Sequence, residues 1–359
     1  MAAKNYMTSL TGKKLLVAPL DWGLGHATRC VPVIRDLLNN HCEVWLAGEE
    51  MQEKLLREEF PSLSFLPLKG YRIKYGKSGF TGKILIQIPS ILRSIKEENK
   101  WLKEQVTKYG FEAVISDNRY GLYHKNIFSV FITHQLYIKS TLGKWSEKML
   151  QKWNYKFINR FNECWVPDKE GENNLAGELS HPEIPPSIPT KYIGPLSRFV
   201  RQSADSTGEE KNIPEIKDHL LIILSGPEPQ RTILENKVVD QIVNYPATAT
   251  IVRGLPGEKN IIPSTNTIHF YNHLSSGELN SEAMKAEFII SRSGYSTIMD
   301  IAALQKKSIL VPTPGQTEQE YLAAHLMKKQ FAFCVDQNNF SLLKNIEEAR
   351  NFEYHLYDK

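Results

Sequence analysis

The chain has 359 residues and a net charge of +4, from 44 basic and 40 acidic side chains. This length suits two domains, and the near balance of charge does not indicate a nucleic-acid-binding protein. The four cysteines are widely scattered, which argues against a disulfide framework or a structural zinc site and favours a reducing cytoplasm. The polar N-terminus lacks the apolar core of a signal peptide, and no run of ~18 apolar residues predicts a membrane span.

Short apolar segments alternate with helical patterns along the first half of the chain. The predicted strands are 15–20, 44–47, 63–66, 113–116, 128–132 and 164–166, and the predicted helices are 27–38, 49–60, 85–108 and 144–161. Strands that alternate with helices indicate a parallel sheet covered on both faces.

Residues 201–218 interrupt this pattern because they are polar and offer little to bury, which predicts a linker. A second series of strands begins at 220–224 and continues near 249–252, 267–270, 287–290, 308–311 and 332–335. The sequence therefore predicts an α/β protein with two tandem, doubly wound, Rossmann-like domains, over 1–200 and 219–359.

Polar residues follow several of the predicted strands, where ligands bind in open α/β sheets. They are Asp21, Asp117, His134 and Asp168 in the first half, and Ser225, Arg253, Ser291 and Thr313 in the second. If the polar loops at the strand ends of the two domains face each other, they would form one cleft between the domains. The alternative is that these loop residues are simply polar.

A glycine turn with a histidine follows the first predicted strand. Gly23 and Gly25 allow a tight turn into the next helix, whose free N–H groups favour negative charge. Arg29 stands where the dinucleotide fingerprint has its third glycine. His26 at this helix start is predicted to be a neutral imidazole that acts as general base. Asp117 is the second candidate, either as the base or as the partner that orients the imidazole. The alternative role for His26 is purely structural.

A second turn joins a strand to a helix at residues 289–300. Ser293, Gly294 and Thr297 can cradle a pyrophosphate without a metal ion, and Asp300 can accept hydrogen bonds from a ribose. The alternative is a helix-capping serine and a solvated aspartate.

A third motif opens the helix that follows the strand near 308–311. Gln316, Gln319 and Glu320 suit the hydroxyl groups of a sugar. Acidic residues also match the dipole of a helix start, which is the alternative reason for Glu320. The chain lacks a phosphate-binding P-loop, an Asp-x-Asp pair and a His-Glu-x-x-His motif, so no metal site is predicted.

Together, the three motifs resemble the glycosyltransferase family 28 group, most specifically over residues 287–330. The resemblance implies a glycosyltransferase-B fold, an acceptor site in the first domain and a metal-independent donor site in the second. It implies that the final helix, near 340–350, crosses back onto the first domain. It assigns the donor diphosphate to Ser293, Gly294 and Thr297, the ribose to Asp300, the base (uracil) to the backbone around His273 and Leu274, and the sugar to Gln319 and Glu320.

Two departures from the family pattern concern the donor. Pro227 and Pro229 replace residues of a glycine-rich loop and remove two N–H donors, which leaves Ser225 and Gly226 for the diphosphate. Glu320 stands where the family has a glutamine.

Three functions remain open. The first is transfer of a sugar from a nucleotide sugar, expected to be UDP-linked, to a lipid-linked or other glycan acceptor, with no cofactor. The run from Gly23 to Cys30 also resembles a sugar-nucleotide hydrolase of the pseudaminic acid pathway, in which water replaces the acceptor. The third is a non-catalytic nucleotide-sugar-binding protein.

Residues 142–161 carry an apolar stripe beside a ridge of basic residues at four-residue spacing. The stripe contains Leu142, Trp145, Met149, Trp153, Phe157 and Phe161. One interpretation is peripheral docking on the anionic inner face of the cell membrane. The other is a stripe that faces the protein core and has a solvated basic flank.

Overall fold

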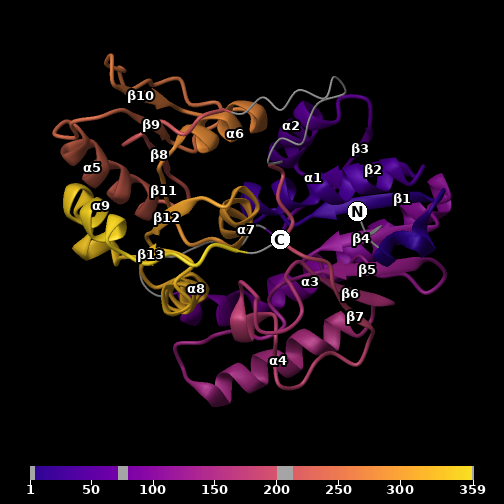
Figure 1. The fold of residues 1–359 in the computed structure, drawn as a ribbon. Helices are drawn as coiled ribbons and strands as arrows, with labels where there is room; N and C mark the ends of the chain where they lie inside the picture. Colours follow the sequence, from indigo (N-terminus) through magenta and orange to yellow (C-terminus); the bar gives the residue numbers. More distant parts are fainter. Residues whose placement is uncertain (1–4, 72–79, 200–212, 358–359) are drawn as a thin grey trace. The chain divides into compact units, whose positions relative to one another are not determined.

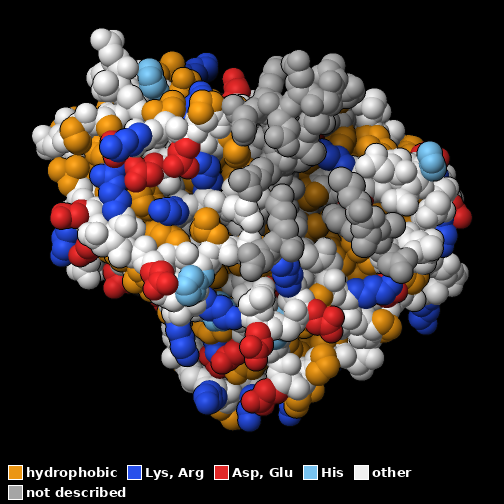
Figure 2. Space-filling view, in the orientation of Figure 1, with side chains coloured by type: hydrophobic (Ala, Val, Ile, Leu, Met, Phe, Trp, Pro, Cys, Tyr) orange, Lys and Arg blue, Asp and Glu red, His pale blue; other side chains and the backbone are white. Residues whose placement is uncertain are grey.

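The computed structural model describes residues 5–71, 80–199 and 213–357. The chain divides into two compact units, Met1–Arg198 and Phe199–Lys359, and each is built on a sheet of its own (Figure 1). Residues 201–212 of the predicted linker lie outside the described residues. Acidic and basic side chains are interspersed over the face that Figure 2 shows, in keeping with the small net charge.

The first unit is a parallel sheet with helices along the connections between its strands. Within the described residues its strand order is β3-β2-β1-β4-β5-β6-β7. The elements are β1 (Lys14–Pro19), α1 (Leu24–Asn39), β2 (Glu43–Gly48), α2 (Glu50–Glu59), β3 (Ser64–Pro67), α3 (Phe80–Tyr109), β4 (Ala113–Asp117), β5 (Phe128–Ile132), α4 (Lys144–Ile158), β6 (Glu163–Val166) and β7 (Thr190–Tyr192), with short 3-10 helices at Asn5–Leu10 and Gly177–Leu179.

The second unit repeats this architecture, and its described strands have the order β10-β9-β8-β11-β12-β13, all parallel. The elements are β8 (Leu220–Ile223), α5 (Gln230–Ile242), β9 (Ala249–Val252), β10 (Ile268–Tyr271), α6 (Ser276–Lys285), β11 (Phe288–Ser291), α7 (Tyr295–Leu304), β12 (Lys307–Leu310), α8 (Thr317–Lys328), β13 (Phe333–Cys334) and α9 (Leu342–Arg350), with a 3-10 helix at Gln337–Asn339.

The central strands are mostly apolar and buried because helices cover both faces of a parallel sheet. In the second core, Ile222, Ile290 and Ile309 from three neighbouring strands pack with residues of α5 and α9. Burial of each such side chain contributes about 1.5–3 kcal/mol. These buried strands hold the loops at their carboxyl ends in fixed positions.

The predicted fold class, two tandem Rossmann-like domains with parallel sheets, is confirmed. Strand β7 was not predicted, because Thr190–Tyr192 is short and only half-buried and so carries no apolar run. The apolar face of α9 places Leu342, Ile346 and Ala349 in the core of the second unit. None of the helices in the described part of the chain has the length and hydropathy needed to span a bilayer.

In each sheet the strand order reverses beside the first strand of the unit. The reversal lies between β1 and β4 in the first sheet and between β8 and β11 in the second. At such a switch point the two adjacent loops leave the sheet in opposite directions and open a crevice for ligands. The predicted site residues are therefore compared with these two positions.

Candidate functional site

His26 and Asp117 meet at the switch point of the first sheet. Asp117 ends β4 and pairs in register with Pro19, the last residue of β1. His26 lies in the first turn of α1, which begins after Gly23, a residue with φ of 83° that suits glycine. Nδ1 of His26 is 3.1 Å from Oδ2 of Asp117. The structure thus brings together two predicted residues that are 91 positions apart in the sequence.

Arg29, one turn further along α1, binds the same carboxylate with its guanidinium fork. Its Nε donates to Oδ2 of Asp117 at 2.8 Å, and its Nη2 donates to Oδ1. Asp117 is completely buried. Burial alone would raise the pKa of Asp117, but the charges of Arg29 and His26 outweigh it and lower the pKa to about 2. Asp117 is therefore a carboxylate at neutral pH.

The surroundings of His26 favour a neutral ring. Burial lowers its pKa, Asp117 opposes this, and Arg29 lowers the pKa further, with a net decrease. A carboxylate can only accept hydrogen bonds, so its contact with Nδ1 favours the tautomer that carries the proton there. Nη2 of Arg29 lies 2.9 Å from the same nitrogen while it donates to Oδ1 of Asp117. A guanidinium only donates, so in this tautomer the contact between Nη2 and Nδ1 is a close approach of two donors and not a hydrogen bond. Nε2 then keeps its lone pair, as a general base requires.

The second switch point gathers the loops that follow β8, β11 and β12. Gly226 follows β8 with a φ of 104°, and a Cβ atom at this position would lie 3.6 Å from Oγ1 of Thr313. Thr313 is buried, and among the described residues its hydroxyl has no hydrogen-bond partner. Next to them, α7 begins after Gly294 with no side-chain cap and no acidic residue in its first turn. The positive end of the helix dipole favours an anion.

Helix α7 presents the predicted diphosphate and ribose residues on one face. Ser296, Thr297 and Asp300 are partly exposed, whereas Ile298 and Met299 are buried. Residues three and four positions apart lie on the same side of a helix. The predicted contacts at Thr297 and Asp300 therefore share one accessible surface.

The residues predicted to contact the donor sugar also hold the loop after β12. Oε1 of Gln319 accepts from the Thr313 N–H at 2.9 Å, and Oε1 of Glu320 accepts from the Gly315 N–H at 2.8 Å. The Ser293 hydroxyl, predicted to contact the diphosphate, donates to the Gln319 carbonyl at 2.8 Å. One polar atom of each side chain is thus already used within the protein. Gln316 precedes α8 as its partly exposed N-cap residue.

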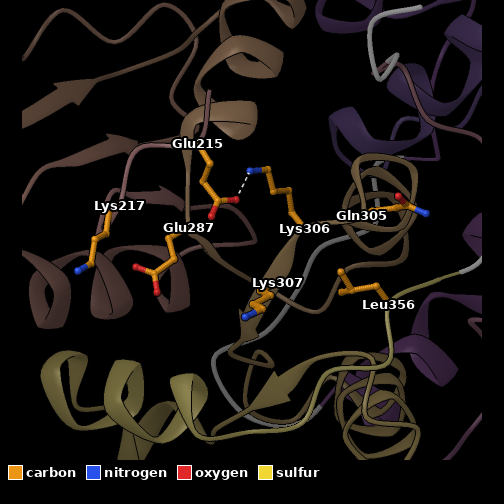
Figure 3. Close-up of a pocket in the computed structure, with 7 residues that line it drawn as sticks. All are labelled: Glu215, Lys217, Glu287, Gln305, Lys306, Lys307 and Leu356. Carbon is orange, nitrogen blue, oxygen red and sulfur yellow. Dashed lines mark hydrogen bonds and ion pairs between the residues drawn. The ribbon is translucent and has the colours of Figure 1, made fainter. Parts of the chain in front are cut away.

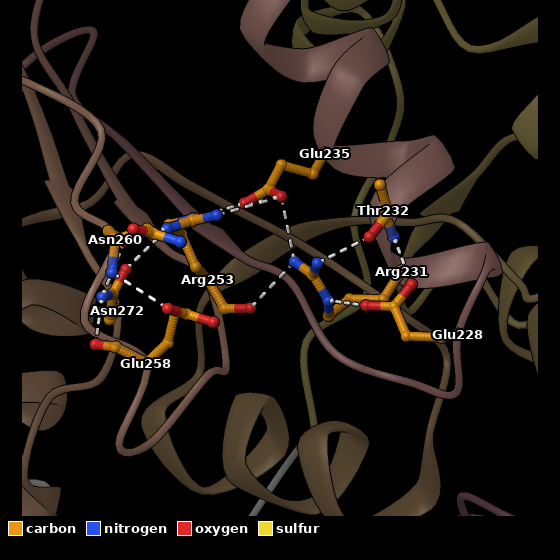
Figure 4. A network of polar contacts seen from close by, with 8 residues as sticks. All are labelled: Glu228, Arg231, Thr232, Glu235, Arg253, Glu258, Asn260 and Asn272. Atoms are coloured by element: carbon orange, nitrogen blue, oxygen red, sulfur yellow. Dashed lines mark hydrogen bonds and ion pairs between the residues drawn. The ribbon is translucent and has the colours of Figure 1, made fainter.

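A network of buried charges supports the loop after β10, where the base is predicted to bind (Figure 4). Arg253 contacts Glu235 through Nε at 2.5 Å and donates through Nη1 to Asn272 at 2.7 Å. Arg231 reaches the other oxygen of Glu235 at 3.1 Å. Asn272 immediately precedes the predicted His273 and Leu274, and Leu274 is buried. Glu235 and Arg231 were not predicted from the sequence, because they lie within α5 and outside any recognised motif.

Some polar residues at strand ends are structural. Asp168 accepts from the N–H groups of Leu175 and Ala176, and Asp21 accepts from that of Tyr71. Arg292 is buried and donates to the carbonyls of the loop that follows β12. For these residues, the interpretation that they merely complete their loops fits better than a role in ligand binding.

A separate pocket lies at the amino-terminal ends of the strands of the second sheet (Figure 3). Its lining residues are Glu215, Lys217, Glu287, Gln305, Lys306, Lys307 and Leu356. Lys306 is held there by Glu215 at 2.7 Å and by two carbonyl groups. The pocket borders the beginnings of β11 and β12, so it is distinct from the loops at the switch point.

A family model and a curated relative both match this chain, and both are glycosyltransferases. Residues 264–359 match the glycosyltransferase family 28 C-terminal domain. Over 344 residues the chain is 22% identical to the UDP-N-acetylglucosamine--N-acetylmuramyl-(pentapeptide) pyrophosphoryl-undecaprenol N-acetylglucosamine transferase of Haemophilus ducreyi, with 92% of this chain and 86% of that one covered.

Solved glycosyltransferases share the fold. The kitacinnamycin glycotransferase is similar with a TM-score of 0.64 and 12% identity, over 94% of this chain and 90% of that one. MurG of Acinetobacter baumannii is similar with a TM-score of 0.55 and 13% identity, over 95% and 91%. The resemblance predicted from the three motifs is confirmed: residues 264–359 match the family 28 C-terminal domain, and the chain is a glycosyltransferase with the glycosyltransferase-B fold.

Proposed function

We propose that this enzyme transfers a sugar from a UDP-linked donor to a lipid-linked or other glycan acceptor, and that His26 is the general base. One observation carries the proposal. His26 and a fully buried, ionised Asp117 are in contact at the switch point of the first sheet. A neutral imidazole oriented by a carboxylate is the arrangement that accepts a proton from a hydroxyl group.

The second switch point supports a donor site. The start of α7, the buried Thr313 hydroxyl and Gly226 would surround the diphosphate, and Asp300 would bind the ribose. The N–H and hydroxyl groups stabilise the charge that develops on the leaving diphosphate, so the proposed transfer needs no metal ion. Gln316, Gln319 and Glu320 would bind the sugar through their remaining polar atoms.

The proposed reaction is a single displacement. The acceptor hydroxyl oxygen forms a bond to the anomeric carbon of the donor sugar while its proton passes to Nε2 of His26. The bond from that carbon to the β-phosphate oxygen breaks, and its electron pair leaves with UDP. Asp117 would stabilise the imidazolium that forms, since it accepts a hydrogen bond from Nδ1–H throughout and stays ionised.

The test measures UDP release from a panel of UDP-sugars, with and without lipid-linked and soluble glycan acceptors. We expect release to require an acceptor and to persist without added divalent metal. In His26→Gln, turnover should fall about 10²–10⁴-fold, whereas UDP affinity measured by calorimetry should stay close to that of the wild type. The control is His41→Asn at an exposed histidine of the same unit, whose φ of 57° asparagine tolerates.

The other outcomes identify the alternatives. Release of free sugar at the same rate with and without acceptors would identify a nucleotide-sugar hydrolase. UDP-sugar binding without turnover under any condition would identify a binding protein. Turnover of His26→Gln above about a tenth of the wild-type value would exclude His26 as the base.

We further propose that the enzyme is a cytoplasmic protein that docks on the inner face of the membrane through α4 and the residues before it. The apolar stripe of residues 142–161 has an exposed first part and a buried last part. Leu142, Trp145, Met149 and Trp153 are 65%, 77%, 42% and 39% exposed, whereas Phe157 and Phe161 are buried in the core. Because the core takes only the last part of the stripe, the interpretation as a wholly core-facing stripe does not fit.

Basic residues flank this exposed face. Lys144, Lys148, Lys152 and Lys156 are all exposed along α4. The acidic residue in its first turn, Glu147, is buried and accepts a hydrogen bond from the Tyr137 hydroxyl. Each lysine near an anionic bilayer contributes on the order of 1 kcal/mol, and exposed tryptophan side chains prefer the interface.

Vesicle sedimentation tests the docking. The wild type should bind vesicles that contain phosphatidylglycerol more strongly than pure phosphatidylcholine vesicles, and salt should weaken this binding. Trp145→Ser/Trp153→Ser and Lys148→Glu/Lys152→Glu should each reduce binding at least about 10-fold. Ile233→Ser/Val243→Ser, at exposed apolar residues of the second unit, is the control. Unchanged binding in both α4 variants would exclude this surface.

A further inference from the structure

Arg29 is a buried cation that lies between three titratable side chains. Its fork binds Asp117, its Nη2 lies 2.9 Å from Nδ1 of His26, and its Nη1 lies 3.2 Å from Nδ1 of His134. We propose that Arg29 is a positioning residue that keeps His26 neutral and correctly oriented by neutralising Asp117. This inference rests on the proposed role of His26 as general base.

The charges around His26 balance each other. A carboxylate within hydrogen-bond distance stabilises an imidazolium, so Asp117 alone would favour a protonated His26 that cannot act as a base. Arg29 adds a positive charge at a similar distance from the imidazole. The pair of Arg29 and Asp117 is neutral overall. His26 therefore keeps the orienting hydrogen bond of the carboxylate without becoming charged.

The geometry of the fork adds orientation to charge. Two parallel N–H groups of Arg29 meet the two oxygens of Asp117 and fix the plane of the carboxylate. The fixed plane directs Oδ2 toward Nδ1 of His26. A lysine could supply the charge but not the planar, two-point contact.

Two further side chains, His134 and Cys30, lie next to Arg29 and Asp117. His134, which follows β5, is buried, and its Nδ1 lies 3.2 Å from Nη1 of Arg29, close enough to accept a hydrogen bond from it. Cys30 of α1 is also buried, with its sulfur 3.8 Å from Oδ2 of Asp117. Burial raises the pKa of the Cys30 thiol well above its usual range, so it stays uncharged. Arg29 and Asp117 thus dominate the electrostatics at His26.

A simple structural ion pair would also join Arg29 to Asp117, so the test must read the ionisation of His26 itself. The full chain is labelled with ¹⁵N-histidine, and the His26 signals are assigned by their loss in His26→Gln. In the wild type we expect a neutral ring at pH 7 with its proton on Nδ1. In Arg29→Met, the midpoint of the His26 titration should rise by at least about one pH unit.

Two more variants separate charge from folding. Arg29→Lys should keep the titration close to that of the wild type but weaken the preference for the Nδ1 proton. Arg29→Met/Asp117→Asn removes both charges at once and should return the midpoint to low pH. If Arg29→Met alone does not fold, these two variants still give the comparison. An unchanged His26 titration in Arg29→Met overturns the proposal. If Arg29→Met does not fold, a proton on Nε2 of His26 in the wild type overturns it.

The titration is independent of activity, so failure of the proposed function would not obscure it. Where UDP release is observed, the acid limb of its pH profile should move upward in Arg29→Met by the same amount as the His26 midpoint. Turnover lost at pH 7 should then be partly recovered near pH 9. A uniform loss of turnover at every pH, with an unmoved His26 titration, would show that Arg29 is only structural.

Discussion

Acid should destabilise the first unit through a single buried carboxylate. Asp117 is completely buried, and the charges of Arg29 and His26 overcome the effect of burial to hold its pKa at about 2, against an ordinary value of 3.8. The folded-state pKa lies below the unfolded-state value. The stabilisation is therefore fully present above about pH 4 and is lost as the pH falls toward 2.

The difference between these two pKa values sets the magnitude. Each pH unit corresponds to about 1.4 kcal/mol, so ionised Asp117 contributes about 2 kcal/mol to the free energy of unfolding. Asp117→Asn has no carboxylate to protonate and should lack this part of the pH dependence. The imidazole of His26 also has a lowered pKa and acts in the same direction, and Asp117 opposes that decrease.

The tryptophans provide an assay that is specific for the first unit. All six lie before residue 199, at positions 22, 45, 101, 145, 153 and 165. Urea unfolding monitored by tryptophan fluorescence at pH 5, 4, 3 and 2 should show that the wild type loses about 2 kcal/mol more than Asp117→Asn. Glu58→Gln, at an exposed carboxylate, should behave like the wild type. Equal losses in the wild type and Asp117→Asn would refute the reasoning.

Three further predictions concern the second unit. Asp300→Ala should weaken UDP binding in calorimetry about 10- to 150-fold through loss of a charge-assisted hydrogen bond, whereas the exposed Asp240→Ala should not. Thr313→Val should leave the melting temperature of the free protein unchanged or raised, because the hydroxyl has no partner among the described residues, yet it should weaken UDP binding. Gly254→Ala places a Cβ atom 2.3 Å from the Leu224 carbonyl at a φ of 68° and should lower the melting temperature, whereas Gly277→Ala in α6 meets no atom within 4 Å and should raise it.

The sequence predicted the central strands well because burial on both faces leaves an unmistakable apolar run. The predicted strands 128–132 and 249–252 coincide with β5 and β9. At the edge of the sheet this signal disappears. Strand β7 is formed by Thr190–Tyr192, all half-buried, and only its pairing with β6 makes it a strand.

The apolar stripe at 142–161 shows a different limit. Its periodicity predicts a helical face, and α4 is indeed a helix over Lys144–Ile158. Periodicity does not reveal how much of that face the core covers. Phe157 packs with Leu20 and Ile95, while Trp145 points into solvent three turns earlier. The end of the core contact depends on where β1 and α3 lie, and that is a property of the tertiary structure.

In the candidate site, too, some residues could be predicted from local sequence, whereas other contacts depend on the tertiary structure. Local motifs identified His26 and the start of α7, because a glycine turn before a helix has a direct physical meaning for ligand binding. Arg29 belongs to the same motif, yet its spacing indicates only that the third glycine of a fingerprint is absent. Its contact with Asp117 joins residues 88 positions apart and depends on β4 lying next to β1.

Gln319 and Glu320 show why residue type alone does not assign a ligand. The amide and carboxylate oxygens that would bind sugar hydroxyls are equally suited to the N–H groups of a turn, and here one oxygen of each binds the loop after β12. The same contacts hold Thr313 beside Gly226, at the second switch point. Substitution of either side chain should therefore disturb the proposed diphosphate site as well as the proposed sugar site. Affinity for UDP alone, which lacks the sugar, separates these effects, because a residue that binds only the sugar should leave it unchanged.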